Sequence, residues 1–277
     1  MAILSIQSRV ASGYVGNAAA TPILQRLGRT VWPVDTVAFS NHPAHGSHSG
    51  GARPAAEIAE LIAGLDAQGL LSSCDAVLSG YLGTAAVGPV VVDAVERTRT
   101  ANPDALWCCD PVMGDNGSFY VAEGIPDFFR ERALPGASIL LPNAFEAAYL
   151  SGKSADTPDR AARAAERLLR AGPDVVVVSG VTRGECVGAV VATADGCWRC
   201  MAPRIDAPAC GAGDAFAALF LGAFLARRDP VRALGQAVSG IHTVLKTTAE
   251  ARSADLELVA ALPDIETPAG FPVERVS

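Results

Sequence analysis

Apolar runs rich in β-branched residues alternate with helix-like segments along most of this 277-residue chain. Runs such as "DAVLSG" and "DVVVVSG" are apolar at consecutive positions, which is typical of strands buried on both faces. Because strand and helix alternate, the pattern predicts a mostly parallel sheet with helices on both of its faces. The length suits one large α/β domain, and we expect a single domain over residues 1–277.

The expected elements are bounded mostly by turn residues such as Gly, Pro and Asp. We expect strands over 2–8, 30–40, 75–79, 106–110, 138–142, 174–179, 187–193 and 198–202. We expect helices over 17–27, 54–68, 84–100, 157–171, 213–227 and 230–248. The "ADG" turn between the last two strands predicts a hairpin that adds antiparallel strands at one edge of the sheet. The Pro-rich tail after Leu262 is expected to be irregular.

The net charge of −7 and the 18% of charged residues are typical of a soluble protein and argue against a nucleic-acid partner, which needs a basic face. No apolar run has the length of a membrane span, and the N-terminus lacks the basic residues of a signal peptide. Seven scattered cysteines, an odd number, favour reduced thiols and a cytoplasmic location. The motif "CWRC", Cys197 to Cys200, has zinc-ligand spacing, but no second Cys or His pair lies nearby, so we expect no zinc site.

The stretch "ACGAGDAF" is unusual because a run of small residues ends in Asp214 and opens directly into an apolar helix. Gly211 and Gly213 bracket Ala212 and let the backbone approach a ligand closely. The free N–H groups at the beginning of that helix suit an anion. Asp is also common in the first turn of a helix, so this stretch alone supports helix capping and a role beside a bound anion equally.

Polar residues also follow other predicted strands, at the edge where parallel sheets bind ligands. In "CDPVMGDNG", Asp110 stands at a strand end, where a carboxylate can hold Mg²⁺ through water. The alternative is an Asx-turn, in which Asp110 caps its own loop. The Gly-rich segment 114–124 is expected to be a lid that closes over a substrate and excludes water.

In "LPNAFE", Asn143 and Glu146 have the spacing of a helix capping box, which is the simplest interpretation of this motif. Beside Asp110, Glu146 also becomes a second acidic group for a metal–phosphate site. Ser8 ends the first predicted strand, although a serine there is an ordinary turn residue. The chain contains neither a P-loop nor a GxGxxG fingerprint after a strand, so a bound nucleotide must be held in another way.

Together these segments resemble the pyridoxal kinases of the ribokinase-like superfamily. The resemblance is carried, in chain order, by "SIQSRVASGYVGNAAATPILQRLG", "VWPVDTVAFSNHPAHG", "CDAVLSGYLG", "CDPVMGD", "LPNAFE" and "GAGDAFAA". The "GAGD" loop indicates only the superfamily, whereas the "GYVGN", "FSNH" and "SGYLG" segments indicate its vitamin B6 branch. The resemblance implies a three-layer α/β/α sandwich and ATP-dependent phosphorylation of the 5′-hydroxyl of pyridoxal, and of pyridoxine or pyridoxamine.

The resemblance also implies roles for residues of this sequence. Asp214 is the expected base that takes the hydroxyl proton, and the backbone N–H groups of Gly211, Ala212 and Gly213 are the expected anion hole. A monovalent cation such as K⁺ near the anion hole and a homodimer are typical of the family. The pyridine ring is expected to contact Ser8, Val15, Phe39 and Tyr81, with Pro43 in the same substrate loop. The Mg-ATP side is expected at Asp110, Asn143, Glu146 and Ser179, with Asp110 and Glu146 toward the metal.

Three residues depart from the family pattern. Pro43 stands where the family has Thr after "FSNH", so a hydroxyl and an N–H donor are missing from the substrate loop. Ser179 stands where Lys or Thr is common, and Ala212 where Thr or Val is more usual. Two alternatives therefore remain beside a pyridoxal kinase. One is a related kinase of another small alcohol, such as a hydroxymethylpyrimidine or a sugar, and the other is a non-catalytic B6-binding or regulatory protein.

Overall fold

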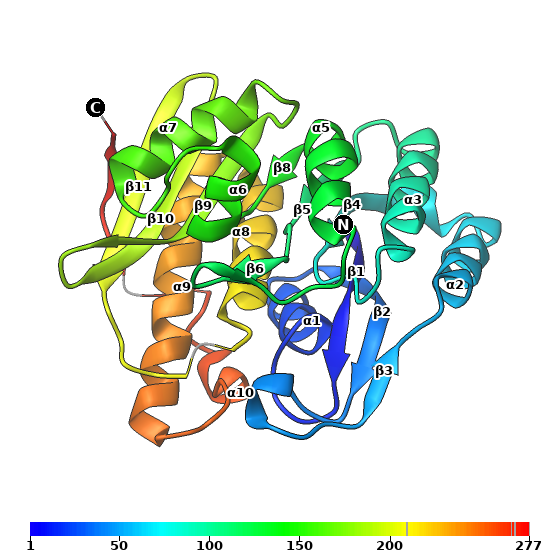
Figure 1. Cartoon of the computed structure of the whole chain (residues 1–277), viewed down its shortest axis with the longest axis horizontal. Helices are drawn as coiled ribbons and strands as arrows, with labels where there is room; N and C mark the ends of the chain where they lie inside the picture. The colour runs from blue at the N-terminus through cyan, green and yellow to red at the C-terminus, as the bar shows by residue number, and fades with distance from the viewer. Residues whose placement is uncertain (209, 267, 269, 277) are drawn as a thin grey trace.

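A ten-stranded sheet forms the centre of the computed structural model, in the order β12-β11-β10-β9-β8-β5-β4-β1-β2-β3 (Figure 1). The structure describes residues 1–208, 210–266, 268 and 270–276. Every neighbouring pair from β2 to β9 is parallel, whereas β10, β11 and β12 are antiparallel additions at one edge and β3 at the other. The strands of this sheet are β1 (Ala2–Val10), β2 (Thr30–Phe39), β3 (Gly50–Ala52), β4 (Cys74–Ser79), β5 (Leu106–Cys109), β8 (Ile139–Leu140), β9 (Val175–Arg183), β10 (Cys186–Thr193), β11 (Gly196–Pro203) and β12 (Val273–Arg275).

Helices cover both faces of the sheet because successive strand residues point alternately into two separate apolar clusters. One face carries α2 (Ala55–Ala67), η2 (Leu70–Ser73), α3 (Val87–Ala101), α4 (Ile125–Phe128), η3 (Phe129–Ala133), α5 (Leu134–Gly136), α6 (Ala144–Ser151) and α7 (Pro158–Leu169). The other carries α1 (Asn17–Arg26), α8 (Ala212–Arg227), α9 (Pro230–Ala251) and α10 (Leu258–Ala261). This gives three layers, as the resemblance implies.

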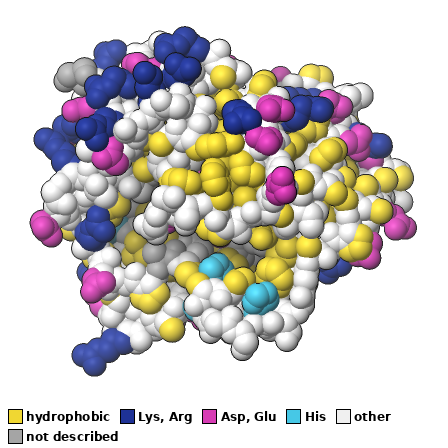
Figure 2. Space-filling model, in the orientation of Figure 1, with side chains coloured by type: hydrophobic (Ala, Val, Ile, Leu, Met, Phe, Trp, Pro, Cys, Tyr) yellow, Lys and Arg dark blue, Asp and Glu magenta, His cyan; other side chains and the backbone are white. Residues whose placement is uncertain are grey.

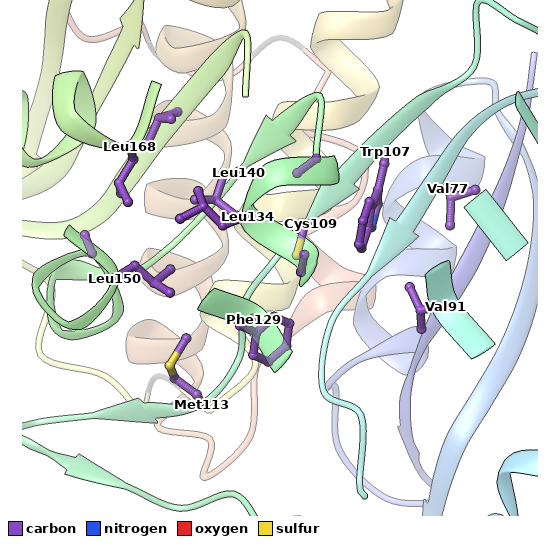
Figure 3. Close-up of a cluster of buried hydrophobic side chains, with 14 of the residues drawn as sticks. Val77, Val91, Trp107, Cys109, Met113, Phe129, Leu134, Leu140, Leu150 and Leu168 are labelled. Atoms are coloured by element: carbon purple, nitrogen blue, oxygen red, sulfur yellow. The ribbon is translucent and has the colours of Figure 1, made fainter. Parts of the chain in front are cut away.

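Buried apolar side chains under the first set of helices pack against the middle of the sheet (Figure 3). Trp107 is only 2% exposed, and its indole N–H donates a hydrogen bond to Ser79 Oγ at 2.8 Å, so its one polar atom is satisfied inside the core. Cys109, the last residue of β5, is also fully buried. The next residue, Asp110, therefore directly follows a strand end that is held in the core.

The predicted parallel sheet, the helices on both faces and the β10–β11 hairpin are confirmed. The prediction of an irregular tail is wrong for Val273–Arg275, which forms β12 against β11. An ion pair between Arg199 Nη2 and Glu274 at 2.8 Å accompanies this pairing. The prediction failed because a three-residue strand among prolines carries little periodicity of its own. The structure also adds β3 at one edge and a separate hairpin of β6 (Gly114–Asp115) and β7 (Ser118–Phe119).

Two strands run past their predicted ends, and each is irregular beside a predicted site residue. β1 continues to Val10, and its register with β2 shifts between Gln7 and Arg9, around Ser8. β9 continues to Arg183, and its register with β10 shifts next to Ser179. Ser8 and Ser179 therefore do not end their strands, as the sequence predicts. They lie at bulge-like irregularities, which re-aim side chains and are common beside binding sites.

Candidate active site

A cleft of about 1090 Å³ opens beyond the carboxyl ends of the parallel strands. Figure 2 shows the molecule hollowed below the middle of one face, with histidine side chains along the edge of the hollow. The cleft wall includes every residue that the sequence predicts for the site. These residues are Ser8, Val15, Phe39, Pro43, Tyr81, Asp110, Asn143, Glu146, Ser179, Gly211, Ala212, Gly213 and Asp214.

The loop before α8 brings backbone N–H groups to the middle of the cleft. Gly211 precedes the helix with a φ of 85°, a conformation that favours glycine. A Cβ at this position would lie 1.8 Å from the carbonyl oxygen of Tyr14, so only glycine fits here. Gly213, in contrast, has no other atom within 4 Å of its Cβ position and faces open space in the cleft. The first turn of α8 is therefore open to an anion.

Asp214 lies in the first turn of α8, directly after this loop. Burial raises the pKa of its carboxyl group to about 6, and hydrogen bonds from the N–H groups of Gly16 and of Asp214 itself partly oppose that increase. Gly16 is the N-cap residue of α1, and a Cβ there would overlap Ser8, so the turn between β1 and α1 packs tightly against the site. A carboxyl group with this pKa is ionised at neutral pH and is a suitable general base.

Two further carboxyl groups face the cleft from neighbouring strand ends. Asp110 follows β5 and is 6% exposed, and Glu146 in α6 is 2% exposed. Burial raises the pKa of Asp110 well above its usual value, and the charges of Glu146 and Asp214 raise it further. Burial also raises the pKa of Glu146, to about 8, against the effect of three backbone N–H donors. The three acidic groups thus repel one another electrostatically.

Glu146 also completes the capping box of α6, as its spacing predicts. Its Oε2 accepts a hydrogen bond from the N–H of Asn143 at 2.8 Å, and Asn143 Oδ1 accepts one from the N–H of Glu146 at 2.9 Å. Its Oε1 accepts bonds from the N–H groups of Met113 at 2.9 Å and Gly114 at 3.4 Å. Both carboxylate oxygens therefore have backbone partners.

Asp110 provides the better test of whether a metal ion fits this place. Within the described part of the chain, no group donates a hydrogen bond to the Asp110 carboxylate, although it is buried beside two other acids. Such an uncompensated carboxylate suits Mg²⁺, which prefers oxygen ligands. Over the same described residues, no three His, Cys, Asp or Glu side chains are placed to hold a metal ion by themselves. Phosphate oxygens and water would have to supply the remaining ligands.

Aromatic and apolar side chains line one end of the cleft. Phe39 ends β2 and packs edge-on against the ring of His48, with centroids 4.8 Å apart. Tyr81 follows β4, and its carbonyl oxygen accepts a hydrogen bond from Thr36 Oγ1 at 2.6 Å. Burial raises the pKa of the Tyr81 phenol, which therefore stays protonated and can donate a hydrogen bond. This end suits a small, flat polar ring.

The opposite end of the cleft is lined by β10, β11 and α9. Ser179 and Asn143 form an isolated parallel bridge at its border. The cleft wall on this side also contains Val238, Ile241 and Leu245 of α9, which the sequence did not predict as site residues. Their spacing of three and four residues is the available signal, but the same spacing is typical of ordinary core packing. The two ends meet at the loop before Asp214.

The predicted lid, residues 114–124, contains the β6–β7 hairpin. Asn143 Nδ2 donates a hydrogen bond to the carbonyl oxygen of Gly114 at 2.8 Å, which ties the hairpin base to α6. Phe119 packs edge-on against Phe145 and Tyr149, with centroids 5.2 and 5.0 Å apart. Tyr120 then lines the cleft, and partial burial together with nearby carboxylates raises the pKa of its phenol.

Cys197 and Cys200 lie three residues apart on β11 and therefore point to opposite faces of the sheet. Cys197 belongs to the cluster under α7 and Cys200 to the cluster under α8 and α9. The two thiols of the "CWRC" motif therefore cannot bind one metal ion.

Among the described helices, none combines the length and the apolar character needed to cross a lipid bilayer.

Comparisons with known proteins agree with this geometry. The phosphomethylpyrimidine kinase family matches residues 63–257. Pyridoxal kinase PdxY of Rubrobacter xylanophilus is 45% identical over 282 residues, covering 99% of this chain and 97% of that protein. The solved pyridoxal kinase of Leishmania donovani in complex with ADP and pyridoxamine superposes with a TM-score of 0.93 at 29% identity, covering 100% of this chain and 99% of that one. The same enzyme has also been solved with ADP and pyridoxine.

Proposed function

This chain belongs to the pyridoxal kinase family, and we propose that it transfers the γ-phosphoryl group of ATP to the 5′-hydroxyl of pyridoxal, and of pyridoxine or pyridoxamine. The observation that carries this proposal is the position of Asp214. It lies at the first turn of α8, between an aromatic end and an apolar end of one cleft. A vitamin ring and a nucleotide base bound at these two ends would meet at the carboxylate and the adjacent N–H groups.

In the proposed reaction, the 5′-oxygen of the vitamin attacks the γ-phosphorus atom. A new oxygen–phosphorus bond forms as the bond between the γ-phosphorus and the β–γ bridging oxygen breaks, and ADP leaves. Asp214 accepts the hydroxyl proton. Its pKa of about 6 leaves the carboxylate ionised at pH 7, and the hydroxyl need lose its proton only as the new bond forms.

The N–H groups of Gly211, Ala212 and Gly213 are the proposed anion hole. Because α8 begins there, its free N–H groups and its dipole both favour negative charge at this point. Charge that accumulates on the transferring phosphoryl group is stabilised without reorganisation of the protein. The same helix terminus also favours the negative carboxylate of Asp214 in its first turn.

Asp110 is the proposed protein group on the Mg²⁺ side, and Glu146 supports it from α6. When bound, Mg²⁺ would neutralise charge on the β- and γ-phosphates. Glu146 would act mainly by holding the Met113–Gly114 backbone, because its oxygens already accept backbone hydrogen bonds. Ser179 and Asn143 are proposed for the nucleotide side. A monovalent cation such as K⁺ near the anion hole completes the proposed set.

The proposed ring contacts are Ser8, Val15, Phe39 and Tyr81, with Pro43 in the loop that covers the ring. Val15 and Ser8 are nearly buried, at 7% and 8% exposure, so the surrounding side chains hold them in place.

We also propose one kinase domain over residues 1–277, a homodimer and a cytoplasmic location.

The test is the ATP-dependent formation of pyridoxal 5′-phosphate by the purified protein. We expect activity with wild type and its loss in Asp214→Asn, which keeps the shape of the side chain and removes the base. A protein inactive toward all three vitamers, or a fully active Asn variant, would refute the proposal. Calorimetric binding of pyridoxal without any turnover would instead support the non-catalytic alternative.

A hydroxymethylpyrimidine kinase is the second candidate, because the family that matches residues 63–257 is named after a substituted pyrimidine, phosphomethylpyrimidine. Pro43 also removes a hydroxyl group and an N–H donor from the substrate loop. A panel of hydroxymethylpyrimidine and the three B6 vitamers at fixed ATP separates the two candidates. A higher kcat/KM for the pyrimidine would favour the second candidate, and a clear preference for pyridoxal would exclude it.

A further inference from the structure

We propose that Asp255, on the segment between α9 and α10, positions the B6 substrate by holding the tip of the substrate loop through His45. The substrate loop is defined as residues 40–49, between β2 and β3. This inference rests on the proposed kinase activity and adds to it a residue from the C-terminal part of the chain. Asp255 acts through another residue, so it is a positioning residue.

The base of the substrate loop is closed by its own hydrogen bonds. The N–H of Ser40 donates to the carbonyl oxygen of Ser49 at 2.9 Å, and the N–H of Ser49 donates to Ser40 Oγ at 2.9 Å. Asn41 Nδ2 donates to the carbonyl oxygen of Ser47 at 3.1 Å. The two ends of the loop are therefore fixed close together, independently of its tip.

The tip of the loop is folded by hydrogen bonds within the loop, such as the one from the N–H of Ala44 to His42 Nδ1 at 3.2 Å. It is the short helix η1 (Pro43–His45), none of whose residues is buried, yet Pro43, Ala44 and the preceding His42 line the cleft. Between this tip and the described residues outside the substrate loop, one polar contact is present, from His45 Nε2 to Asp255 Oδ1 at 3.6 Å. The position of this part of the cleft wall thus depends on an electrostatic contact more than on packing.

Asp255 is the fixed partner in this contact. The next residue, Leu256, is 2% exposed, and Leu258 is fully buried in the cluster under α8 and α9. The N–H of Asp255 donates to Ser253 Oγ at 3.3 Å, which orders the turn that follows α9. Buried neighbours therefore anchor the backbone at Asp255, whereas His45 lies on a tip that contains no buried residue.

Asp255 also touches two other walls of the site. A Cβ on Gly13 would lie 2.9 Å from the same Oδ1 atom, so Asp255 packs directly against the turn that leads from β1 to α1. After burial, the charge of Asp255 is a further cause that raises the pKa of the Cys210 thiol. Cys210 immediately precedes Gly211 of the anion loop. Asp255 therefore lies where the substrate loop, the β1–α1 turn and the anion loop converge.

The exposure of the pair suits a contact that opens and closes. The His45 and Asp255 side chains are 32% and 33% exposed, so solvent screens their attraction. Such a contact is weak enough to open when substrate enters and strong enough to favour the closed wall once the ring is bound. Its loss should therefore weaken substrate binding by a small factor without changing phosphoryl transfer.

The experiment compares Asp255→Ala, His45→Ala and the double variant by steady-state kinetics, with pyridoxal and ATP varied in turn. Each single variant should raise the KM for pyridoxal about two- to fivefold, the range expected for the loss of one exposed polar contact, with kcat and the KM for ATP unchanged. The double variant should show no further increase, because both substitutions remove the same contact. Asp255→Glu should recover part of the wild-type KM.

The matched control is Glu250→Ala, which removes an exposed ion pair within α9, with Lys246 Nζ at 3.8 Å, outside the cleft. All of its kinetic constants should match wild type. A pyridoxal KM in Asp255→Ala equal to that of wild type, or single effects that multiply in the double variant, would overturn the inference. An equal rise in the KM for ATP would show a merely structural role and would also overturn it. A wild-type protein that phosphorylates no B6 vitamer would instead refute the proposed function.

Discussion

The carboxylate of Glu146 accepts a hydrogen bond from the N–H of Met113 at 2.9 Å and so joins the beginning of α6 to the base of the lid. The same carboxylate caps α6 through Asn143. The capping box and the acidic site, which are alternatives in the sequence, are therefore combined in one side chain. Its buried charge beside Asp110 is unfavourable in the absence of a cation, which leads to the first prediction.

Replacing Glu146 with Gln should make stability less dependent on pH. The folded-state pKa of about 8 lies above the ordinary value of 4.5, so the folded protein binds more protons between these values and loses stability as pH rises through this window. Gln carries no charge and escapes this loss, although it gives up the acceptor for Asn143 N–H, at about 1 kcal/mol. In thermal unfolding without Mg²⁺ or nucleotide, the Tm of the variant relative to that of wild type should be higher at pH 9 than at pH 6. Parallel pH curves would contradict the prediction.

Activity should decrease as pH falls through about 6. Burial raises the pKa of Asp214 to about that value, and a general base acts only when it is deprotonated. The kcat/KM for pyridoxal should therefore decline toward pH 5, measured as pyridoxal 5′-phosphate formation in buffers of constant ionic strength. Asp214→Asn should lower kcat by about 10²- to 10⁴-fold and abolish this limb of the profile. An acid limb that persists in the Asn variant would assign it to another group.

The two glycines of the anion loop should respond differently to alanine. Gly211→Ala forces a Cβ into Tyr14 at a φ of 85°, so we expect a loss of at least about 1–3 kcal/mol of stability. Gly213→Ala meets no neighbouring atom and lies in the first turn of α8, so its stability should stay within about 0.5 kcal/mol of wild type. Urea unfolding distinguishes them. If both variants lost the same free energy of unfolding, the prediction that only Gly211 is closely packed would be wrong.

The aromatic contacts of Phe119 should control closure of the lid. Phe119 is 46% exposed, so Phe119→Ala should cost little global stability, but it removes the two edge-on pairs that hold the lid against Phe145 and Tyr149. We expect faster proteolytic cleavage within residues 114–124 and more ATP hydrolysis per phosphorylated vitamin, because water is excluded less well. Val259→Ala, at another exposed apolar position of 62% exposure, is the control and should change neither readout. Wild-type cleavage and coupling in Phe119→Ala would exclude a role in closure.

Features that depend on neighbouring residues could be predicted from the sequence. The alternation of strands and helices, the "ADG" hairpin and the Asn143–Glu146 capping box follow from local periodicity and turn chemistry. Parallel strands end at one edge of their sheet, so residues after different parallel strands, such as Asp110 after β5 and Asn143 after β8, had to lie near one another once the topology was known. All the predicted site residues line the same cleft, although the strand-end rule places only those that directly follow parallel strands.

Features that depend on close packing between distant segments were decided only by the tertiary structure. The bulge at Ser8, the strand β12 and the apolar face of α9 that lines the cleft carry no local signal that separates them from an ordinary strand, tail or core helix. The contact of His45 with Asp255 exists because the segment between α9 and α10 packs beside the substrate loop. Local chemistry determines which segments form and where strands end, but the distance between two side chains far apart in sequence is set by the packing of the whole core between them.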